Sequence, residues 1–309
     1  MKKEITVLIP TFNRCELLNR AITSLERQDE RISIHCVISD NFSSDDTQEM
    51  VNSWVNKKRN LKITYTKQDC QIKPLENWKS LLQYIDTDFS KFLFDDDWLE
   101  DNALKQMLND LAELQAKTII YNTNIFAKTH NYEPINRYYK HNDTQLTIEK
   151  VVNSILRIEE ALPVTPSAAI QESNSIVNAL LFSEINSDCS EQAIGNDLIM
   201  NFYSLLKGDK SFFIDKSIVN LWGGEDSITM NTTNSKVLSF CYVTSLIYIL
   251  DKFDCHITSN QLKTINHKIF ANNFRSMFNN EFKKFSLDEK FKPKLSYQEL
   301  LKYLYRAKT

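Results

Sequence analysis

The chain has 309 residues, of which 42% are hydrophobic and 25% are charged, so it is long enough for one large α/β domain and a smaller addition. Its formal net charge of −3 gives it no general attraction for nucleic acid, which argues against that class of partner. All four glycines lie in the C-terminal half, whereas dinucleotide-binding loops and P-loops need glycines directly after the first strand. A nicotinamide-dependent enzyme and a Walker-type NTPase are therefore disfavoured.

Strands and helices are predicted to alternate through the first hundred residues. Apolar and β-branched runs predict strands over 5–9, 34–39, 61–66 and 92–94, and apolar residues at the helical period predict helices over 16–28, 50–55 and 75–85. Repeated β–α units require a mostly parallel central sheet with helices on both faces, which is the Rossmann-like α/β class. Ligands of such sheets bind beyond the carboxyl ends of the strands.

After Trp98 the pattern is looser and the prediction is less regular. Helices are predicted over 103–114, 151–162, 176–182 and 191–206, strands over 118–126 and 168–171, and a polar loop over 131–147. From about residue 235 the chain is predicted to be helical, over 237–253, over 261–282 and from 296 onward. We therefore expect an α/β domain over 1–230 and a helical C-terminal region over 231–309.

Polar residues follow three of the predicted strands. They are Pro10-Thr11-Phe12-Asn13, Asp40-Asn41 and Asp95-Asp96-Asp97. Three adjacent carboxylates repel one another, and a hard divalent cation relieves that cost. Taken alone, the aspartate triplet also fits a solvated turn that caps the next helix, and the residues around Asp40 also fit a loop with a helix N-cap.

In combination, three segments resemble a known family in both order and spacing. They read ITVLIPTFNR at 5–14, VISDNFSSD at 37–45 and FLFDDD at 92–97. This combination resembles family 2 of the glycosyltransferases, which have the GT-A fold, and it is especially similar to the bacterial surface-polysaccharide branch that includes abequosyltransferase-like proteins. The resemblance is specific over roughly 4–100, loose over 101–229 and absent beyond. It implies a nucleotide-sugar half over 1–100 and an acceptor half over 101–230.

The resemblance implies an inverting, metal-dependent transfer of one sugar from a nucleoside-diphosphate donor. The acceptor would be a hydroxyl of a glycan or a lipid-linked oligosaccharide in bacterial surface-polysaccharide synthesis. Two alternatives remain. A sugar-nucleotide nucleotidyltransferase would normally carry a glycine-rich N-terminal loop, and none is present. A non-catalytic nucleotide-binding scaffold of the same fold would have no reason to keep the aspartate triplet.

The resemblance also assigns roles in the N-terminal half. Asp97 and Asp95 match the ends of the family's D-x-D motif, which implies that they hold Mn²⁺ or Mg²⁺, with Asp95 or Asp96 near the ribose. Thr11 and Asp40 stand where the family contacts the nucleobase and ribose. The other implied nucleotide-sugar contacts are Pro10, Asn13, Arg14, Asn41, Lys73 and Asn77. The family often has an Arg-Asn pair before the third helix, but Glu76-Asn77 stands here, and Lys73 is the candidate replacement for the arginine.

Asp40 bears on the choice of nucleobase. An ionised Asp40 can accept the N3–H of uracil, whereas cytosine has no proton at that position. A guanine N–H edge could also satisfy the carboxylate. We therefore expect uridine nucleotides to bind best, guanosine nucleotides second and cytidine nucleotides last.

The catalytic base of the family is an acidic residue at a helix start late in the domain. Asp197, in Gly195-Asn196-Asp197-Leu198, is the best match, and Glu191 is the reserve. The structural alternative is an aspartate favoured at a helix N-terminus by the helix dipole. Residues 222–227, which include two glycines, are expected either to flank the acceptor site or to form a plain turn.

Two features bear on the location of the protein. The six cysteines form no C-x-x-C pair, and the first residues show no apolar run of the length of a secretory signal, which together favour a cytoplasmic protein. Residues 283–309 contain eight Lys/Arg and three Asp/Glu, a net charge of about +5, interleaved with aromatic residues. This stretch predicts peripheral contact with the inner face of the cell membrane, and a terminal helix that packs on the domain is the alternative.

Overall fold

The computed structural model describes residues 3–55, 60–127, 131–135, 143–182, 193, 195–224, 242–243 and 245–276, without the side chains of 269–276. Its strands are β1 (Lys3–Thr11), β2 (Ile32–Asp40), β3 (Leu61–Lys67), β4 (Phe89–Phe92), β5 (Trp98–Leu99), β6 (Thr118–Ala127), β7 (Pro134–Ile135), β8 (Thr144–Gln145), β9 (Ala169–Glu172) and β10 (Ser211–Gly223). Its helices are α1 (Cys15–Glu26), α2 (Thr47–Trp54), α3 (Pro74–Ser80), α4 (Ala103–Leu114), α5 (Ile148–Leu156), α6 (Ser173–Phe182), α8 (Asn196–Leu206) and α10 (Ser259–Ser276). Short 3₁₀ turns occupy Leu82–Tyr84 and Pro166–Ala168, and residues 245–252 are also helical.

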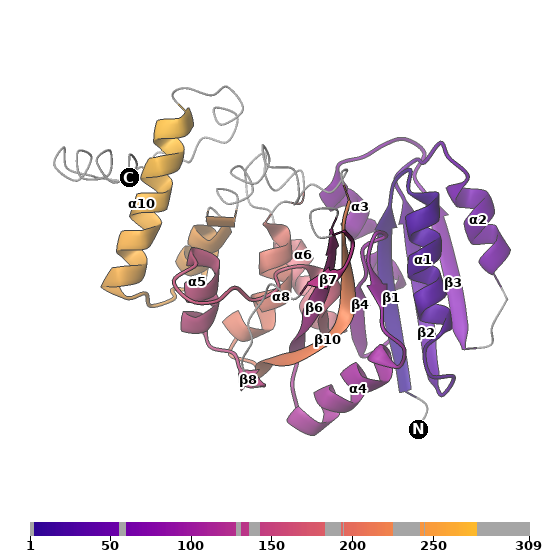
Figure 1. Cartoon of the computed structure of the whole chain (residues 1–309), viewed down its shortest axis with the longest axis horizontal. Coiled ribbons are helices and arrows are strands. Elements are labelled where there is room, and N and C mark those ends of the chain that lie inside the picture. The colour runs from indigo at the N-terminus through magenta and orange to yellow at the C-terminus, as the bar shows by residue number, and fades with distance from the viewer. Residues whose placement is uncertain are drawn as a thin grey trace.

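One twisted sheet runs through the described part of the chain (Figure 1). Its strand order is β3-β2-β1-β4-β9-β6-β10-β5, with β7 paired to β6 and β8 paired to β10. β1 is parallel to β2 and β4, β2 is parallel to β3, and β6 is parallel to β10. Because β9 is antiparallel to both β4 and β6, these two strands share one direction. Six strands therefore bring their carboxyl ends to the same edge, which confirms the Rossmann-like GT-A class expected from the sequence.

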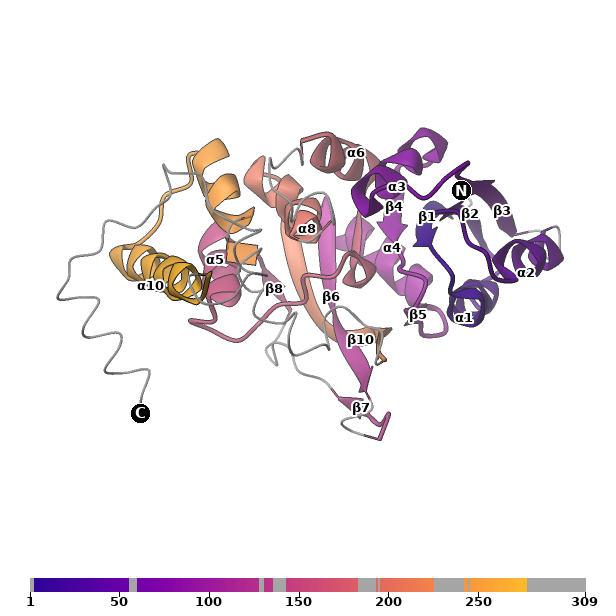
Figure 2. The same ribbon diagram turned by 90° about the horizontal axis from the view of Figure 1, so that it is seen from above.

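The two faces of the sheet bury separate apolar layers, as the two-residue period of β1 requires. Ile5, Val7 and Ile9 face the layer that contains α1, α2 and α4. Leu8 faces the opposite layer, which contains α3, α5, α6 and α8. Figure 2 shows α1 and α2 on one side of the N-terminal strands and α3 and α6 on the other. Helices on both faces leave the carboxyl edge of the sheet as the place for polar chemistry.

The structure corrects the looser predictions of the second half. The helix predicted over 151–162 runs from Ile148 to Leu156 and ends because Arg157 adopts a left-handed conformation, with φ of 56° and its N–H donating to the carbonyl of Asn153. The loop predicted over 131–147 contains β7 and β8. β10 is a 13-residue strand that the sequence pattern missed, because a register shift between Ile214 and Val219 interrupts its alternation.

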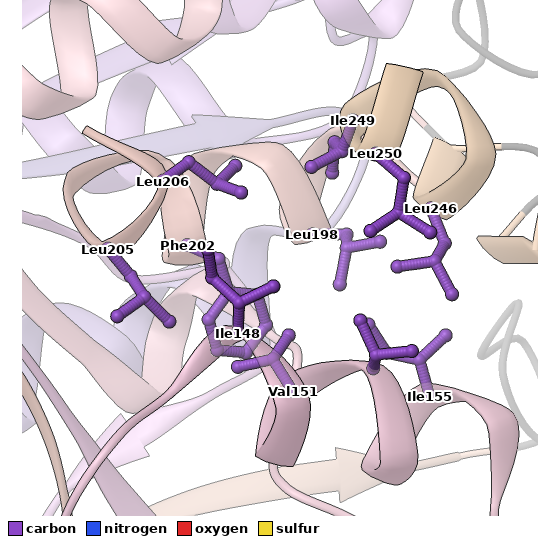
Figure 3. A pocket seen from close by; sticks show the side chains of 11 residues that line it. Ile148, Val151, Ile155, Leu198, Phe202, Leu205, Leu206, Leu246, Ile249 and Leu250 are labelled. Atoms are coloured by element: carbon purple, nitrogen blue, oxygen red, sulfur yellow. The ribbon is translucent and has the colours of Figure 1, made fainter. Parts of the chain in front are cut away.

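Residues 245–252 pack against α5 and α8 in the same apolar layer as the α/β domain. Figure 3 shows the narrow space that remains between these helices, lined by aliphatic side chains and Phe202. Its free volume is about 10 Å³, barely enough for one water molecule, so the helices pack closely. The described part of the C-terminal region thus shares a core with the domain, and the boundary between 230 and 231 stays a prediction.

Two expectations about the C-terminal region concern residues that the structure does not describe. The charged stretch over 283–309 and the helix predicted from 296 lie outside the described residues. Among the helices that are described, none has both the length and the apolar character needed to cross a membrane.

Candidate active site

Three adjacent aspartates follow β4 at the carboxyl edge of the sheet. Asp95 and Asp97 are almost wholly buried, with 5% and 4% of their surface exposed, whereas the side chain of Asp96 is 17% exposed. The Leu93 N–H donates to the carbonyl of Leu8 at 3.0 Å, which continues the pairing of β4 with β1. The triplet is therefore held by the central strands, and two of its carboxylates are removed from water.

Thr11 and Arg14 converge on the first two aspartates. Thr11 Oγ1 donates to Asp95 Oδ2 at 2.8 Å. Arg14 Nη1 lies 3.1 Å from Asp95 Oδ1 and 3.0 Å from Asp96 Oδ2, so one guanidinium group bridges two carboxylates. Burial and the charge of Asp96 raise the pKa of Asp95, and the contacts of Arg14 and Thr11 oppose that rise. The structure thus brings together four of the residues assigned to the nucleotide-sugar site.

Asp97 has a different environment. Burial raises its pKa well above the usual range of a carboxyl, and the charge of Asp96 adds to the rise. The Ser167 hydroxyl hydrogen-bonds the carboxylate, and the Trp222 N–H donates to Asp97 Oδ1 at 3.2 Å. These two donors come from chain segments about 70 and 125 residues away, so tertiary structure alone places them there.

Lys91 lies behind the triplet and is fully buried. Its Nζ donates to the carbonyls of Phe92 at 2.8 Å and Ser167 at 2.9 Å. Burial lowers the pKa of Lys91 to about 7, while the charge of Asp97 raises it. The buried ammonium therefore offsets part of the negative charge of Asp97 and ties β4 to the segment that carries Ser167.

By themselves, the three aspartates supply only some of the ligands that a divalent cation needs. No group of three His, Cys, Asp or Glu side chains converges on a cation site within the described residues. Asp95 and Asp97 nevertheless supply hard carboxylate oxygens in a desolvated setting. Mg²⁺ and similar ions are usually held by one or two carboxylates together with substrate phosphates. The donor set therefore fits a cation whose coordination a diphosphate completes.

Asp40, the residue assigned to the nucleobase, is fully buried at the end of β2. Its Oδ1 accepts the Ser43 N–H at 2.8 Å, and its Oδ2 accepts the Tyr65 hydroxyl at 2.5 Å. Burial and the adjacent Asp40 raise the pKa of Tyr65, which keeps that hydroxyl protonated as a donor. Each carboxylate oxygen retains a second lone pair beyond these two hydrogen bonds.

Asn13 and Asn41 position the loops around Asp40. Asn13 has φ of 51°, a left-handed conformation that asparagine tolerates, and its Oδ1 accepts the Ser44 N–H at 2.7 Å. Asn41 exchanges two hydrogen bonds of 2.9 Å with the backbone of Ile72. The first contact ties the loop after β1 to the loop after β2, and the second fixes the chain that leads into α3.

Lys73, Asn77 and Pro10 have unequal access to a ligand. Lys73 is exposed at the N-cap of α3. Asn77 is buried, accepts the Ser39 hydroxyl at 2.7 Å and donates to the Ser39 carbonyl at 3.2 Å. Pro10 is buried in β1, in register with Ser39. Asn77 and Pro10 thus support the strand ends, while Lys73 stands at the surface near them.

Asp197 lies in the first turn of α8 and is half-buried. The preceding Gly195 has φ of 86°, which gives the chain the turn that starts the helix. Asp197 Oδ1 accepts the Leu198 N–H at 2.8 Å, and Oδ2 accepts the Tyr242 hydroxyl at 2.5 Å. Burial raises the pKa of Asp197 to about 7, and the bond from Tyr242 lowers it. Glu191, the reserve candidate, lies outside the described residues.

A contact with β6 places the C-terminal end of α8 relative to the sheet. Thr118, the first residue of β6, donates to Ser204 near the end of α8 at 3.1 Å. The C-terminal end of α8 is therefore at the amino edge of the sheet. The contacts that hold Asp197 come from Tyr242 and from its own helix, separate from those of the aspartate triplet.

Arg20, Trp98 and Tyr132 also lie at the carboxyl edge of the sheet, and sequence reasoning assigned them no role. The guanidinium carbon of Arg20 lies 4.1 Å from the ring centroid of Trp98 and 4.7 Å from that of Trp222. The ring of Tyr132 stacks on Trp222 with centroids 5.0 Å apart. The two glycines after Trp222 were the one sequence signal in this region. They suggested a site or a turn at 222–227, but they did not predict that the Trp222 ring contacts Arg20 and Tyr132.

Comparisons with known proteins show the family of this chain. Residues 6–161, half of the chain, match the family model described as Glycosyl transferase family 2. The chain is 33% identical over 110 residues to GalNAc(5)-diNAcBac-PP-undecaprenol beta-1,3-glucosyltransferase of Campylobacter jejuni, a match that covers 36% of this chain and 35% of that protein. It is 32% identical over 101 residues to abequosyltransferase RfbV of Salmonella typhimurium, covering 32% of this chain and 30% of that protein. The matches span about a third of the length of both relatives.

Solved structures show the same fold. S. aureus TarS 1-349 in complex with UDP-GlcNAc superposes with a TM-score of 0.57 at 12% identity, over 90% of this chain and 82% of that chain. The complex of the same protein with UDP gives a TM-score of 0.57 at 17% identity, over 97% and 78% of the two chains. The matched family segment contains the aspartate triplet and every residue assigned to the nucleotide-sugar site. The chain belongs to glycosyl transferase family 2.

Proposed function

We propose that this protein transfers a sugar from a nucleoside-diphosphate donor, with UDP-sugars favoured, to a hydroxyl of a glycan or lipid-linked oligosaccharide in bacterial surface-polysaccharide synthesis. Family membership supports the reaction class. The names of the two relatives support the biological setting, since one acts on an undecaprenol-linked acceptor and the other transfers abequose. The UDP and UDP-GlcNAc complexes of the structural neighbour support the choice of donor.

The observation that carries this proposal is the buried aspartate triplet with Thr11 and Arg14 against it. Asp97, with Asp95, would hold Mn²⁺ or Mg²⁺, which neutralises the negative charge of a departing diphosphate. Arg14 bridges Asp95 and Asp96 and so keeps both side chains in one arrangement before the donor binds. Burial of these carboxylates excludes water, which strengthens every charge interaction made there.

Asp197 is the proposed general base. A sugar hydroxyl is a poor nucleophile until its proton is accepted, and general-base help contributes roughly 10²–10⁴ in rate. A pKa of about 7 suits that task, because the carboxylate is then ionised often enough to act and basic enough to take the proton. Direct displacement by the activated hydroxyl, on the side opposite the diphosphate, would invert the anomeric carbon.

Asp40 is proposed to select the nucleobase. Its carboxylate, held by Ser43 and Tyr65, would accept the N3–H of uracil. Tight binding of a cytidine donor with Asp40 at the base would refute this assignment.

The deciding experiment is a thermal-shift screen of nucleoside diphosphates and nucleotide-sugars with and without manganese. A ligand at a hundred times its dissociation constant stabilises the folded state by about 2.7 kcal/mol, a shift of several degrees. We expect the largest shift with a uridine nucleotide and manganese together. The absence of any nucleotide-dependent shift would contradict the proposal.

A second assay separates the enzyme from a non-catalytic scaffold. Slow hydrolysis of the bound UDP-sugar in the presence of manganese is expected of a transferase that lacks its acceptor. Nucleotide binding without any turnover of donor, with or without added acceptor, would favour the scaffold.

A further inference from the structure

A column of stacked groups lies beside the aspartate triplet. Arg20 of α1 lies over the ring of Trp98 in β5 and over that of Trp222 at the end of β10. The ring of Tyr132, between β6 and β7, stacks on Trp222 with an angle of only 6° between the two planes. We call these four residues the aromatic column. Four chain segments that are distant in sequence therefore meet in one stack.

Two hydrogen bonds connect the aromatic column to the proposed reaction centre. The Trp222 N–H donates to Asp97 Oδ1 at 3.2 Å. Arg20 Nη2 donates to the carbonyl of Asp96 at 2.7 Å. These bonds place the backbone of Trp222 and the guanidinium group of Arg20 directly beside the aspartate triplet.

The three rings of the aromatic column stand on the opposite side of β4 from the nucleotide residues, while Arg20 reaches them from α1. In the sheet, β1 and β2, which end at Thr11 and Asp40, lie on one side of β4, while β6 and β10 lie on the other. Given the proposed function, a donor with its base at Asp40 and its diphosphate at Asp97 directs its sugar away from β2. Beyond β4 in that direction lie β9, β6 and β10, and Trp222 is near the end of β10.

Tyr132 gives the aromatic column an exposed ring. It is 42% exposed, although one face of the ring is covered by Trp222. Its φ of 57° is a left-handed conformation that bulky residues seldom adopt, and its N–H closes the turn onto the carbonyl of Ala127 at 3.0 Å. Strained backbone of this kind persists where the surroundings hold it, and it is concentrated at ligand sites.

We propose that Tyr132, supported from behind by Trp222, forms the acceptor subsite and binds a pyranose ring of the acceptor by stacking on its outward face. The C–H face of a pyranose is apolar and slightly positive, and it complements the negative face of an aromatic ring. The hydroxyl groups at the edge of the sugar stay free for water and for the base. Arg20 lies over the ring of Trp222, which supports Tyr132, and is therefore a positioning residue.

The test compares Tyr132→Ala and Tyr132→Phe with the wild type, and uses Leu262→Ala as the matched control. Leu262 is 48% exposed on α10, and Figure 1 shows that helix at the far end of the molecule from β1. The probes are four octyl pyranosides, those of glucose, galactose, N-acetylglucosamine and N-acetylgalactosamine, with UDP and manganese present. Saturation-transfer NMR reports which sugar protons touch the protein, and a titration of the same signal gives the dissociation constant.

We expect at least one probe to bind with its strongest contacts on the C–H protons of a single ring face. Tyr132→Ala should weaken the binding of that probe about three- to tenfold. Tyr132→Phe should change its dissociation constant less than twofold, and Leu262→Ala should leave the dissociation constant unchanged. UDP affinity should be equal in all four proteins. Melting temperatures of the variants exclude unfolding as the cause.

Three results would overturn the acceptor subsite. They are the absence of binding by all four probes to a wild type that still binds UDP, unchanged probe binding in Tyr132→Ala, and a loss of UDP affinity in that variant. The last result would assign the ring to the donor. Failure of the wild type to bind any nucleotide would instead refute the proposed function, so the two failures are distinguishable.

Discussion

At the scale of single residues, the burial of the Asp97 carboxylate is unfavourable unless a positive charge or hydrogen-bond donors compensate its negative charge. Lys91 and Ser167 supply part of that compensation within the protein. A raised carboxyl pKa means that the ionised form is disfavoured, so a cation that requires the ionised form should bind with a strong pH dependence. In the proposed function, metal, diphosphate and carboxylate would therefore act as one site.

The first prediction is that Asp97→Ala abolishes the effect of manganese on UDP binding. The reason is that a missing carboxylate leaves the cation with too few ligands to bridge the diphosphate. Calorimetric titration with UDP, with and without manganese, measures the effect. Asp110→Ala is the matched control, because Asp110 is a buried carboxylate on α4 that accepts the Tyr121 hydroxyl instead. Equal metal enhancement in Asp97→Ala and wild type would refute the assignment.

The second prediction concerns the protonation of Asp197. A base acts in its ionised form, and the pKa of Asp197 is raised to about 7. Transfer should therefore rise about tenfold per pH unit below 7 and level off above it. Asp197→Asn should bind donor and metal normally while transfer falls roughly 10²–10⁴-fold. Near-normal transfer by that variant would eliminate Asp197, and Glu191 would be tested next.

Tyr242 provides an independent check on the same residue. Its hydroxyl donates to Asp197 and lowers the pKa of that carboxyl, so Tyr242→Phe should raise the pKa further. The acidic limb of the pH–rate profile should then move to higher pH. Tyr203→Phe on α8 is the matched control, since Tyr203 packs against Phe182 and Phe253 rather than Asp197. If the pH–rate profile does not move in Tyr242→Phe, the ionisation of Asp197 does not set the pH dependence of the transfer rate.

At the scale of elements, the helix over 245–252 packs on α5 and α8 in the same apolar layer as the helices of the domain. Leu246 is 2% exposed and Leu198 is fully buried, and both line the narrow space between these helices (Figure 3). Close packing of this kind makes the helix part of the cooperative core. The boundary predicted between residues 230 and 231 would then mark a change in sequence pattern, and the regions on its two sides would unfold together.

The third prediction tests that coupling. Leu246→Ala should lower the free energy of unfolding by about 2–5 kcal/mol, because it removes buried methyl groups and leaves a cavity. Urea unfolding followed by circular dichroism measures it, and a single transition is expected. The exposed Leu262→Ala should change stability by no more than about 0.5 kcal/mol. A separate early transition in Leu246→Ala, with the main one unshifted, would show that residues 231–309 unfold independently.

At the scale of the whole molecule, the sequence has a net charge of −3, whereas residues 283–309 carry about +5. This separation of charge would let the C-terminal stretch approach an anionic membrane while the rest of the chain is repelled by it. An enzyme with a lipid-linked acceptor would gain from such an orientation, since substrate and site would share a surface.

The fourth prediction is that the full chain binds vesicles of phosphatidylserine and phosphatidylcholine, and that deletion of 283–309 abolishes this binding. Each basic residue near the membrane surface adds roughly 1 kcal/mol to the free energy of binding, and salt should weaken this electrostatic attraction. Co-sedimentation at low and high salt measures both effects, with pure phosphatidylcholine vesicles as the control. Sedimentation that is unaffected by the deletion, or absent throughout, would favour a terminal helix that packs on the domain.

What the sequence determined by itself is the class of the fold and the edge of the sheet at which the aspartate triplet lies. The alternation of Ile5, Val7 and Ile9 and the helical periods of the first half report which faces are buried, and these patterns are local. The aspartates follow directly from β4, so their place at the carboxyl edge could be predicted without knowing any long-range contact.

Tertiary structure decided the partners of these residues. Periodicity says that a face is buried but not which distant residue lies across it, so nothing local joins Arg20 to Trp222 or Asp197 to Tyr242. β10 was missed because its polar interruption at Asp215 and Lys216 hides the alternation, while pairing with β6 along most of its length stabilises it as a strand. Side chains that meet across strands and helices owe their positions to packing, which depends on the whole chain at once.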